Sequence, residues 1–122
     1  MTPLKSYRDL EVWKKSIDLA EMVYRLSANF PQEERFGITN QIRRAVVSVP
    51  ANIAEGAERT GTKEFLQFLS IASGSLAETE TFLILAERLG ITQEAAISPL
   101  MEQAAHVGRM LNGLKRSLRS KI

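Results

Sequence analysis

The chain has 122 residues, of which 44% are hydrophobic and 25% are charged, and its net charge at pH 7 is +2. These values are ordinary for a globular protein and predict one domain spanning residues 1–122. The absence of cysteine excludes disulfides and thiolate catalysis, and the single histidine, His106, leaves little for a zinc site or a catalytic triad.

The N-terminal residues 1–8 are polar and basic, and no apolar core follows them, so they do not form a signal peptide. No run of residues approaches the roughly 18 apolar positions that a membrane-spanning helix needs. We therefore expect a cytoplasmic protein that does not contact a membrane.

Three breaks divide the chain, at residues 29–31, 59–62 and 89–92. The four segments between them have helical periodicity. Short connections favour antiparallel neighbours, so the sequence predicts an all-α protein, an antiparallel up-down-up-down four-helix bundle.

The first predicted helix covers about residues 9–27, and two neighbouring apolar lines follow it at spacings of three and four. The first line is Leu10, Trp13, Ile17, Ala20 and Tyr24, and the second is Val12, Leu19, Val23 and Leu26. Together they cover about half of the helix circumference at ~100° per residue, which is wider than an edge helix of a monomeric bundle needs.

The second predicted helix, about residues 36–58, is apolar on two faces. The core stripe is Ile38, Ile42, Ala45, Val49 and Ile53, and the second face is Val47, Pro50, Ala54 and Ala57. Between them runs a polar line of Gln41, Arg44, Ser48, Asn52, Glu55 and Arg59. A helix with two apolar faces is normally buried, and a monomeric four-helix bundle does not easily cover both.

The third predicted helix covers about residues 62–89, with Thr62 as its N-cap and Gly90 just past its end. Its central stripe is Phe65, Leu69, Ala72, Leu76 and Leu83, widened by Phe68, Ile71, Phe82, Ile84 and Leu85. The small residues 72–75 would let a neighbouring helix approach closely. The excess apolar surface on the first three helices predicts self-association; cover by loops and termini is the alternative.

The fourth predicted helix covers about residues 93–118, although Pro99 favours a start nearer Ser98. Its narrow apolar seam is Ile97, Leu100, Ala104, Val107, Leu111, Leu114 and Leu118. From residue 107 onwards the chain carries five basic residues and no acid: Arg109, Lys115, Arg116, Arg119 and Lys121. Such a block attracts polyanions, but it also suits the negative end of a helix dipole, and both interpretations stay open.

Glu80 lies near the core stripe of the third helix, and a carboxylate there needs a partner. The polar line of the second helix offers candidates, which predicts a structural polar network of Arg44, Asn52, Glu55, Arg59 and Glu80. Two acids of this set could instead bind a metal or do acid–base chemistry. However, the Glu-x-x-His signature of bundle metal sites and a phosphate-binding glycine loop are both missing. We therefore favour the structural network and expect neither an enzyme, nor a metal, nor a cofactor.

Residues 41–59 read QIRRAVVSVPANIAEGAER, and this stretch closely resembles the signature of the 23S rRNA-intervening-sequence four-helix-bundle proteins. Supporting matches are LEVW at 10–13, FP at 30–31 with Glu34 following, and FLQFLSIASGSLAETET at 65–81. The resemblance covers about residues 7–90, and the fourth helix matches only in its pattern. The family motif is carried here by Arg43, Arg44, Asn52, Glu55 and Arg59.

The resemblance implies an antiparallel four-helix bundle that is often found as a ring-shaped homopentamer. Some family members are encoded inside intervening sequences of bacterial 23S rRNA genes. The accessory variability determinant of diversity-generating retroelements is similar in fold, and it forms a basic pentameric barrel that binds its reverse transcriptase and nucleic acid. For most members no activity is established, so the resemblance implies a binding role and leaves the ligand open.

We therefore expect a homo-oligomeric, non-enzymatic binding protein that associates with structured RNA or an RNA–protein complex through basic surfaces. Its expected partners are other copies of itself, as a pentamer by resemblance, and RNA or a nucleic-acid enzyme. The residues expected to contact phosphates are Arg43, Arg44, Lys115, Arg116 and Arg119. The alternative is a protein-interaction scaffold that does not bind nucleic acid.

Overall fold

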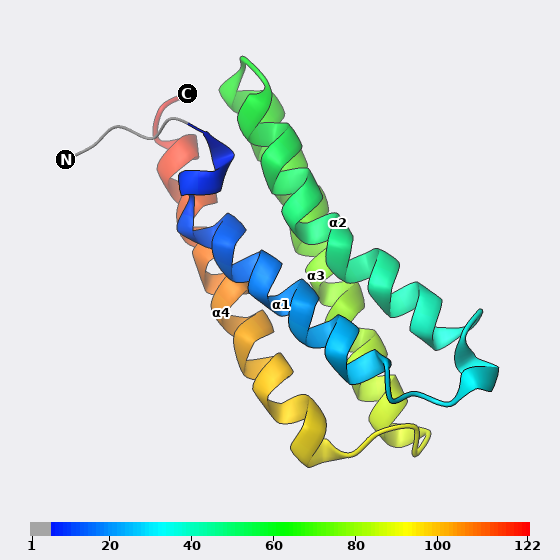
Figure 1. The fold of residues 1–122 in the computed structure, drawn as a ribbon. Helices are drawn as coiled ribbons and strands as arrows, with labels where there is room; N and C mark the ends of the chain where they lie inside the picture. The colour runs from blue at the N-terminus through cyan, green and yellow to red at the C-terminus, as the bar shows by residue number, and fades with distance from the viewer. Residues whose placement is uncertain (1–5) are drawn as a thin grey trace.

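The computed structural model describes residues 6–122, which form four α-helices and two short 3-10 turns (Figure 1). In chain order they are η1 (Tyr7–Asp9), α1 (Glu11–Ser27), η2 (Gln32–Glu34), α2 (Ile38–Glu58), α3 (Thr62–Arg88) and α4 (Glu94–Arg119). Each α-helix packs against two others in the cyclic order α1, α2, α3, α4, and the chain direction alternates along it. The predicted all-α, up-down-up-down bundle is confirmed.

The first helix begins at Glu11 and not at residue 9, because a separate turn precedes it. In that turn the backbone N–H of Arg8 donates to Ser6 Oγ at 3.1 Å, and the N–H of Ser6 donates to Asp9 Oδ2 at 3.3 Å. This reciprocal capping closes η1 on itself. Leu10 then adopts an extended conformation, which ends the turn and starts α1.

The two ends of α3 differ in how well they were predicted. Thr62 is the first helical residue and Gly61 is the N-cap, so the predicted Thr62 cap is wrong by one position. Gly90 does follow the helix, with a φ of 74°. Its N–H donates to the Glu87 carbonyl at 3.0 Å, and the N–H of Ile91 donates to the Ala86 carbonyl at 2.9 Å. This is a Schellman motif, which needs a residue that tolerates positive φ.

The fourth helix begins at Glu94, so the start expected nearer Ser98 is wrong. Pro99 lies inside the helix and cannot donate a hydrogen bond to the carbonyl of Ala95. Both residues are exposed, so water can reach that carbonyl, and the helix tolerates the proline.

One stripe of each helix faces the common core. On α2 and α4 the predicted core lines are buried, except that Leu114 is half-buried. On α1 the second predicted line is the central one, since Leu19 and Val23 are fully buried. The first line turns outward, with Ile17 39% and Tyr24 44% exposed. Periodicity could not distinguish the two lines, because both are apolar at the same spacing.

The contact between α2 and α3 is the most extensive in the bundle. Gly56 of α2 makes it possible, because a Cβ at this position would lie 2.6 Å from the Cβ of Phe68 and 3.0 Å from Cδ1 of Phe65. The close approach predicted at residues 72–75 is found at Ser75, whose hydroxyl lies 2.8 Å from that of Ser48 on α2, whereas a Cβ at Gly74 would meet no atom within 4 Å.

The second apolar face of α2 is partly covered. Pro50 is buried, and η1 packs against α2, as the alternative of cover by termini expects. Val47, by contrast, is 43% exposed. On α3 the widening residues Ile71 and Leu85 are 52% and 41% exposed. Apolar surface therefore remains on the outside of the bundle.

The long helix α3 has a composition that the sequence analysis did not single out. By length and composition alone it could cross a membrane, and it is the one helix within residues 6–122 that meets this criterion. A core helix of a bundle has the same properties. Here Leu69, Ala72, Leu76 and Leu83 of α3 lie in the core shared with the other three helices.

Candidate nucleic-acid interface

Exposed arginines follow the outer side of the C-terminal half of α4. The apolar seam of this helix faces the core, so residues on the opposite side face water. Arg109, Arg116 and Arg119 are all exposed there, and Lys121 is exposed just beyond the helix end. None of these four forms an ion pair with a residue in the 6–122 range. We call Arg109, Arg116, Arg119 and Lys121 the α4 ridge.

Lys115 does not belong to the α4 ridge, although the sequence analysis placed it among the phosphate contacts. It is buried, with 9% of its surface exposed, and it follows Leu111 and precedes Leu118 on the inner side of α4. Burial lowers the pKa of Lys115, and the positive charge of Arg119 lowers it further. No carboxylate in the described part of the chain pairs with it. Position 115 follows Leu111 by four residues and precedes Leu118 by three, so the helical repeat allows it on the core side.

Arg43 joins α2 to α1. Its Nε donates to Ser27 Oγ at 2.8 Å and its Nη2 donates to the Tyr24 carbonyl at 3.3 Å. The guanidinium carbon also lies 4.6 Å from the centre of the Tyr24 ring. These contacts fix the side chain and make Arg43 a structural link between the two helices, which its position in the motif did not reveal.

Arg44 is exposed and lies between two shallow depressions on the surface of α2. Arg43 and Tyr24 share the first depression with it, and Ser75 and Glu78 of α3 share the second. The carboxylate on the same surface is thus Glu78, not the predicted partner Glu80. Arg44 forms no ion pair with any described residue, so its guanidinium is available to a ligand.

The predicted polar network does not form one connected set within residues 6–122. Arg59 pairs with Glu55 at 2.9 Å and approaches Glu64 at 3.9 Å. Asn52 Nδ2 instead donates to both the carbonyl and the hydroxyl oxygen of Ser48, each at 2.8 Å.

Glu80 is half-buried and forms no ion pair with a described residue, and burial raises the pKa of its carboxyl group. Within residues 6–122 no group of three or more histidine, aspartate or glutamate side chains is placed to hold a metal ion.

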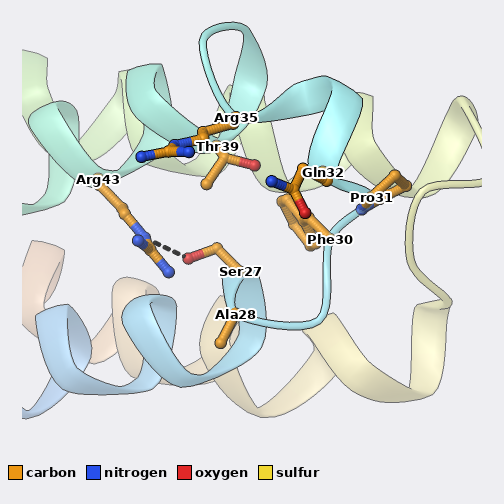
Figure 2. Close-up of a pocket in the computed structure, with 8 residues that line it drawn as sticks. All are labelled: Ser27, Ala28, Phe30, Pro31, Gln32, Arg35, Thr39 and Arg43. Carbon is orange, nitrogen blue, oxygen red and sulfur yellow. Dashed lines mark hydrogen bonds between the residues drawn. The ribbon is translucent and has the colours of Figure 1, made fainter.

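A pocket that sequence reasoning missed lies where α1, η2 and the start of α2 meet (Figure 2). Its volume is about 310 Å³. The lining residues are Ser27, Ala28, Phe30, Pro31, Gln32, Arg35, Thr39 and Arg43. The spacing of four between Thr39 and Arg43 was the available signal, since residues four apart share a helix face, whereas Arg35 precedes the helix.

The structure separates the predicted phosphate contacts into two groups. Arg43 and Arg44 lie in the N-terminal half of α2, while Arg116 and Arg119 lie in the last turns of α4. These segments are at opposite ends of the bundle (Figure 1). One bundle therefore presents two distinct basic surfaces.

Comparison with known proteins identifies the type of chain. A family model described as "23S rRNA-intervening sequence protein" matches residues 8–113. The fold is similar to the crystal structure of a protein of unknown function from the S23 ribosomal protein family of Bacteroides thetaiotaomicron, with a TM-score of 0.77 and 24% sequence identity. That match covers 85% of this chain and 97% of the other, and at this identity it shows the fold alone. No match is found among proteins with curated descriptions.

Proposed function

Because the chain belongs to the 23S rRNA-intervening sequence protein family, we propose that it is a homo-oligomeric, non-enzymatic protein that binds structured RNA or an RNA–protein complex. The α4 ridge is the observation that carries this proposal. After Glu102 the chain contains no further acid, so no carboxylate on the same stretch neutralises the ridge. Unpaired arginines on one helix side provide the phosphate contacts that dominate nucleic-acid affinity.

The state of other basic residues supports this choice of surface. Lys14, Arg25 and Arg59 each pair with a glutamate on their own helix, at 3.4, 2.6 and 2.9 Å. Such residues would have to give up a partner before they bound a phosphate. Arg116 and Arg119 have no such partner to lose.

Self-association is the second part of the proposal. Five apolar side chains on α1 and α3 are between 39% and 62% exposed: Ile17 and Tyr24 of α1, Ile71 and Leu85 of α3, and Leu89 directly after α3. Burying such side chains against a second copy is favourable, by about 25 cal/mol for each Å² of apolar surface. Each added copy contributes a net charge of +2 and another α4 ridge, so assembly strengthens attraction to a polyanion. The resemblance found in the sequence favours a pentamer, and the proposed location is the cytoplasm.

A titration of fluorescently labelled structured RNA, followed by anisotropy, tests the RNA-binding part. We expect affinity to fall by on the order of tenfold or more as salt rises from about 50 to about 200 mM. Arg116→Glu with Arg119→Glu should weaken binding by at least roughly tenfold, because two phosphate contacts become repulsions. The control, Lys63→Glu with Arg88→Glu, changes the net charge equally at exposed positions of α3 and should bind almost as the wild type does. Absence of binding at low salt would contradict the proposal.

The second candidate is a protein-interaction scaffold, which the exposed apolar side chains favour on their own. Phe36 is 85% exposed and Leu89 is 62% exposed, so both are available for contact with a protein partner. If the protein assembles but binds no RNA at low salt, this candidate replaces the first. If this chain acts as the retroelement accessory proteins do, its partner is a reverse transcriptase. Co-purification with such an enzyme would support this relation.

A further inference from the structure

The pocket between α1, η2 and α2 contains two arginines with no acidic partner. Arg43 donates to the neutral oxygens of Ser27 and Tyr24, and the described contact of Arg35 is with the ring of Phe36, 5.4 Å from its centre. Neither guanidinium pairs with a carboxylate of residues 6–122. In Figure 2 the Arg43 side chain is directed to Ser27, and the Arg35 side chain lies beside Thr39 on the α2 side of the pocket. A pocket lined by two cationic side chains and by no acidic one attracts an anion.

The acids nearest in sequence do not neutralise this pair. Glu33 is exposed, and neither Glu33 nor Glu34 lines the pocket. Glu34 is directed to Gly37, where its Oε1 lies 3.2 Å from the position that a Cβ would occupy. The positive charge of the pocket is therefore not cancelled from within the same loop.

A buried hydroxyl provides independent evidence for a ligand. Thr39 is 9% exposed and is one of the residues that line the pocket, and its Oγ1 has no hydrogen-bond partner in the described chain. An unpaired buried hydroxyl costs free energy, so such groups normally have a partner. Thr39 is also the second residue of α2, whose N-cap, Gly37, offers no side-chain cap.

We propose that this pocket binds a phosphate group. The Arg35 guanidinium provides a charged, fork-shaped set of donors that matches phosphate oxygens. Arg43 provides its positive charge and the N–H groups that Ser27 and Tyr24 do not use. The Thr39 hydroxyl donates to a third oxygen. The volume of about 310 Å³ leaves room beside Phe30 and Pro31 for more than the phosphate itself. That the phosphate group comes from RNA rests on the proposed function. That the pocket binds a phosphate group does not.

Titration of the ¹⁵N-labelled full chain with inorganic phosphate tests the site directly. At constant low ionic strength, maintained with chloride, we expect saturable shifts of the backbone N–H signals of Ile38, Thr39 and Asn40. The side-chain Nε–H signals of Arg35 and Arg43 should shift with the same midpoint. Chloride alone at equal ionic strength should not reproduce these shifts. If phosphate produces no saturable shift at these groups, the proposal is overturned.

Two variants locate the binding to individual groups. Arg35→Gln removes an exposed charge and Thr39→Val removes the hydroxyl at constant shape, and each should weaken phosphate binding by on the order of tenfold. Arg88→Gln, an exposed arginine on α3, is the matched control and should bind as the wild type does. Thr39→Val should also melt at a higher temperature in the absence of phosphate, because the unpaired hydroxyl is gone. Wild-type phosphate affinity in both pocket variants would contradict the assignment.

Short RNAs with and without a 5′-phosphate identify the source. Shifts with the phosphorylated RNA alone assign the pocket to a terminal phosphate, and shifts with both assign it to the backbone. If inorganic phosphate shifts the signals and neither RNA does, the pocket binds phosphate but the phosphate does not come from RNA. The reverse case, RNA bound at the α4 ridge with no shift in the pocket, overturns this inference and leaves the proposed function intact.

Discussion

The hydroxyl group of Ser75 on α3 donates to the hydroxyl oxygen of Ser48 on α2 across 2.8 Å. Asn52 donates to the same oxygen, so Ser48 joins two helices and two turns of α2. The middle of the polar line on α2 is thus a contact inside one bundle. The two residues at the N-terminal end of this line, Gln41 and Arg44, are exposed on the surface.

Replacing Ser48 with alanine should destabilise the bundle. The change leaves the Ser75 hydroxyl and one Asn52 N–H without their partner, and each group is at least partly buried. We expect the free energy of unfolding in urea to fall by about 1–3 kcal/mol. Ser70→Ala, at an exposed position of α3, is the control and should change it by less than about 0.5 kcal/mol. Equal effects of the two variants would show that the hydroxyl pair contributes nothing.

The link from α2 to α1 depends on the shape of the Arg43 side chain and not only on its charge. Arg43→Lys keeps the charge but loses the paired donation to Ser27 and Tyr24 and the stacking on the Tyr24 ring. We expect a loss of about 1–2 kcal/mol in chemical denaturation. Arg44→Lys, one residue along, should have no measurable effect, since Arg44 forms no ion pair with any described residue. A stable Arg43→Lys protein would argue against the structural role.

The glycines of α2 and α4 should respond to alanine with opposite signs. Gly56→Ala places a Cβ 2.6 Å from Phe68, so α2 and α3 must separate, and we expect a loss of about 1–3 kcal/mol by thermal and urea unfolding. At Gly113 a Cβ would approach no atom closer than 3.8 Å. Gly113→Ala should therefore gain about 0.5–1 kcal/mol through helix propensity. A stabilising Gly56→Ala would mean that the α2–α3 contact is looser than described.

The Lys115 side chain, most of which is buried, should make stability depend on pH at the alkaline end. Because the pKa is lowered in the folded chain, the unfolded chain keeps this proton to a higher pH. Stability should therefore rise as pH increases from the lowered folded pKa to the ordinary value of 10.5. Lys115→Met should remove this rise and increase the free energy of unfolding at pH 7 by on the order of 1 kcal/mol.

The comparison of Lys115→Met with wild type by urea unfolding at several pH values measures this effect. Lys63→Met, at an exposed lysine of α3, is the matched control and should follow the wild-type pH profile. A destabilised Lys115→Met protein at pH 7 would indicate that the charge has a partner in solution.

Light scattering coupled to size exclusion should give the mass of two or more chains of 13.6 kDa each at micromolar concentration. Ile71→Glu with Leu85→Glu places charges on the exposed apolar side of α3 and should shift the mass toward that of one chain. The same charge change on α4, Asn112→Glu with Ser117→Glu, should leave the mass unchanged. A wild-type mass of 13.6 kDa would contradict self-association.

The sequence was sufficient for the helices and for most of the core, because each segment repeats its apolar residues at a helical period. The core side of α1 was not determined in the same way, since two apolar lines compete there. Only the neighbouring helices decide that Leu19 faces inward and Ile17 outward. Lys115 was misplaced for a related reason: its charge indicated the surface, while its position between Leu111 and Leu118 put it inside.

The candidate sites were less accessible from the sequence. The α4 ridge could be predicted, because an acid-free basic stretch is visible in the residues themselves. The phosphate pocket could not, since it depends on the chain turning after Pro31 and on Ser27 lying beside Arg43. Such contacts between residues 16 apart arise from packing of α1 on α2, which no local pattern encodes.

The most extensive helix contact also sets an order of events in folding. The helices α2 and α3 are joined by residues 59–61 alone, so their contacts close a short loop at small entropic cost. The contact of α1 with α4 instead joins distant parts of the chain, as in the bond from Gln103 Nε2 to the Lys15 carbonyl at 3.0 Å. The hairpin of α2 and α3 should therefore form first. Because α4 follows the other three helices in the chain, α1, α2 and α3 leave the ribosome before the helix that completes their core.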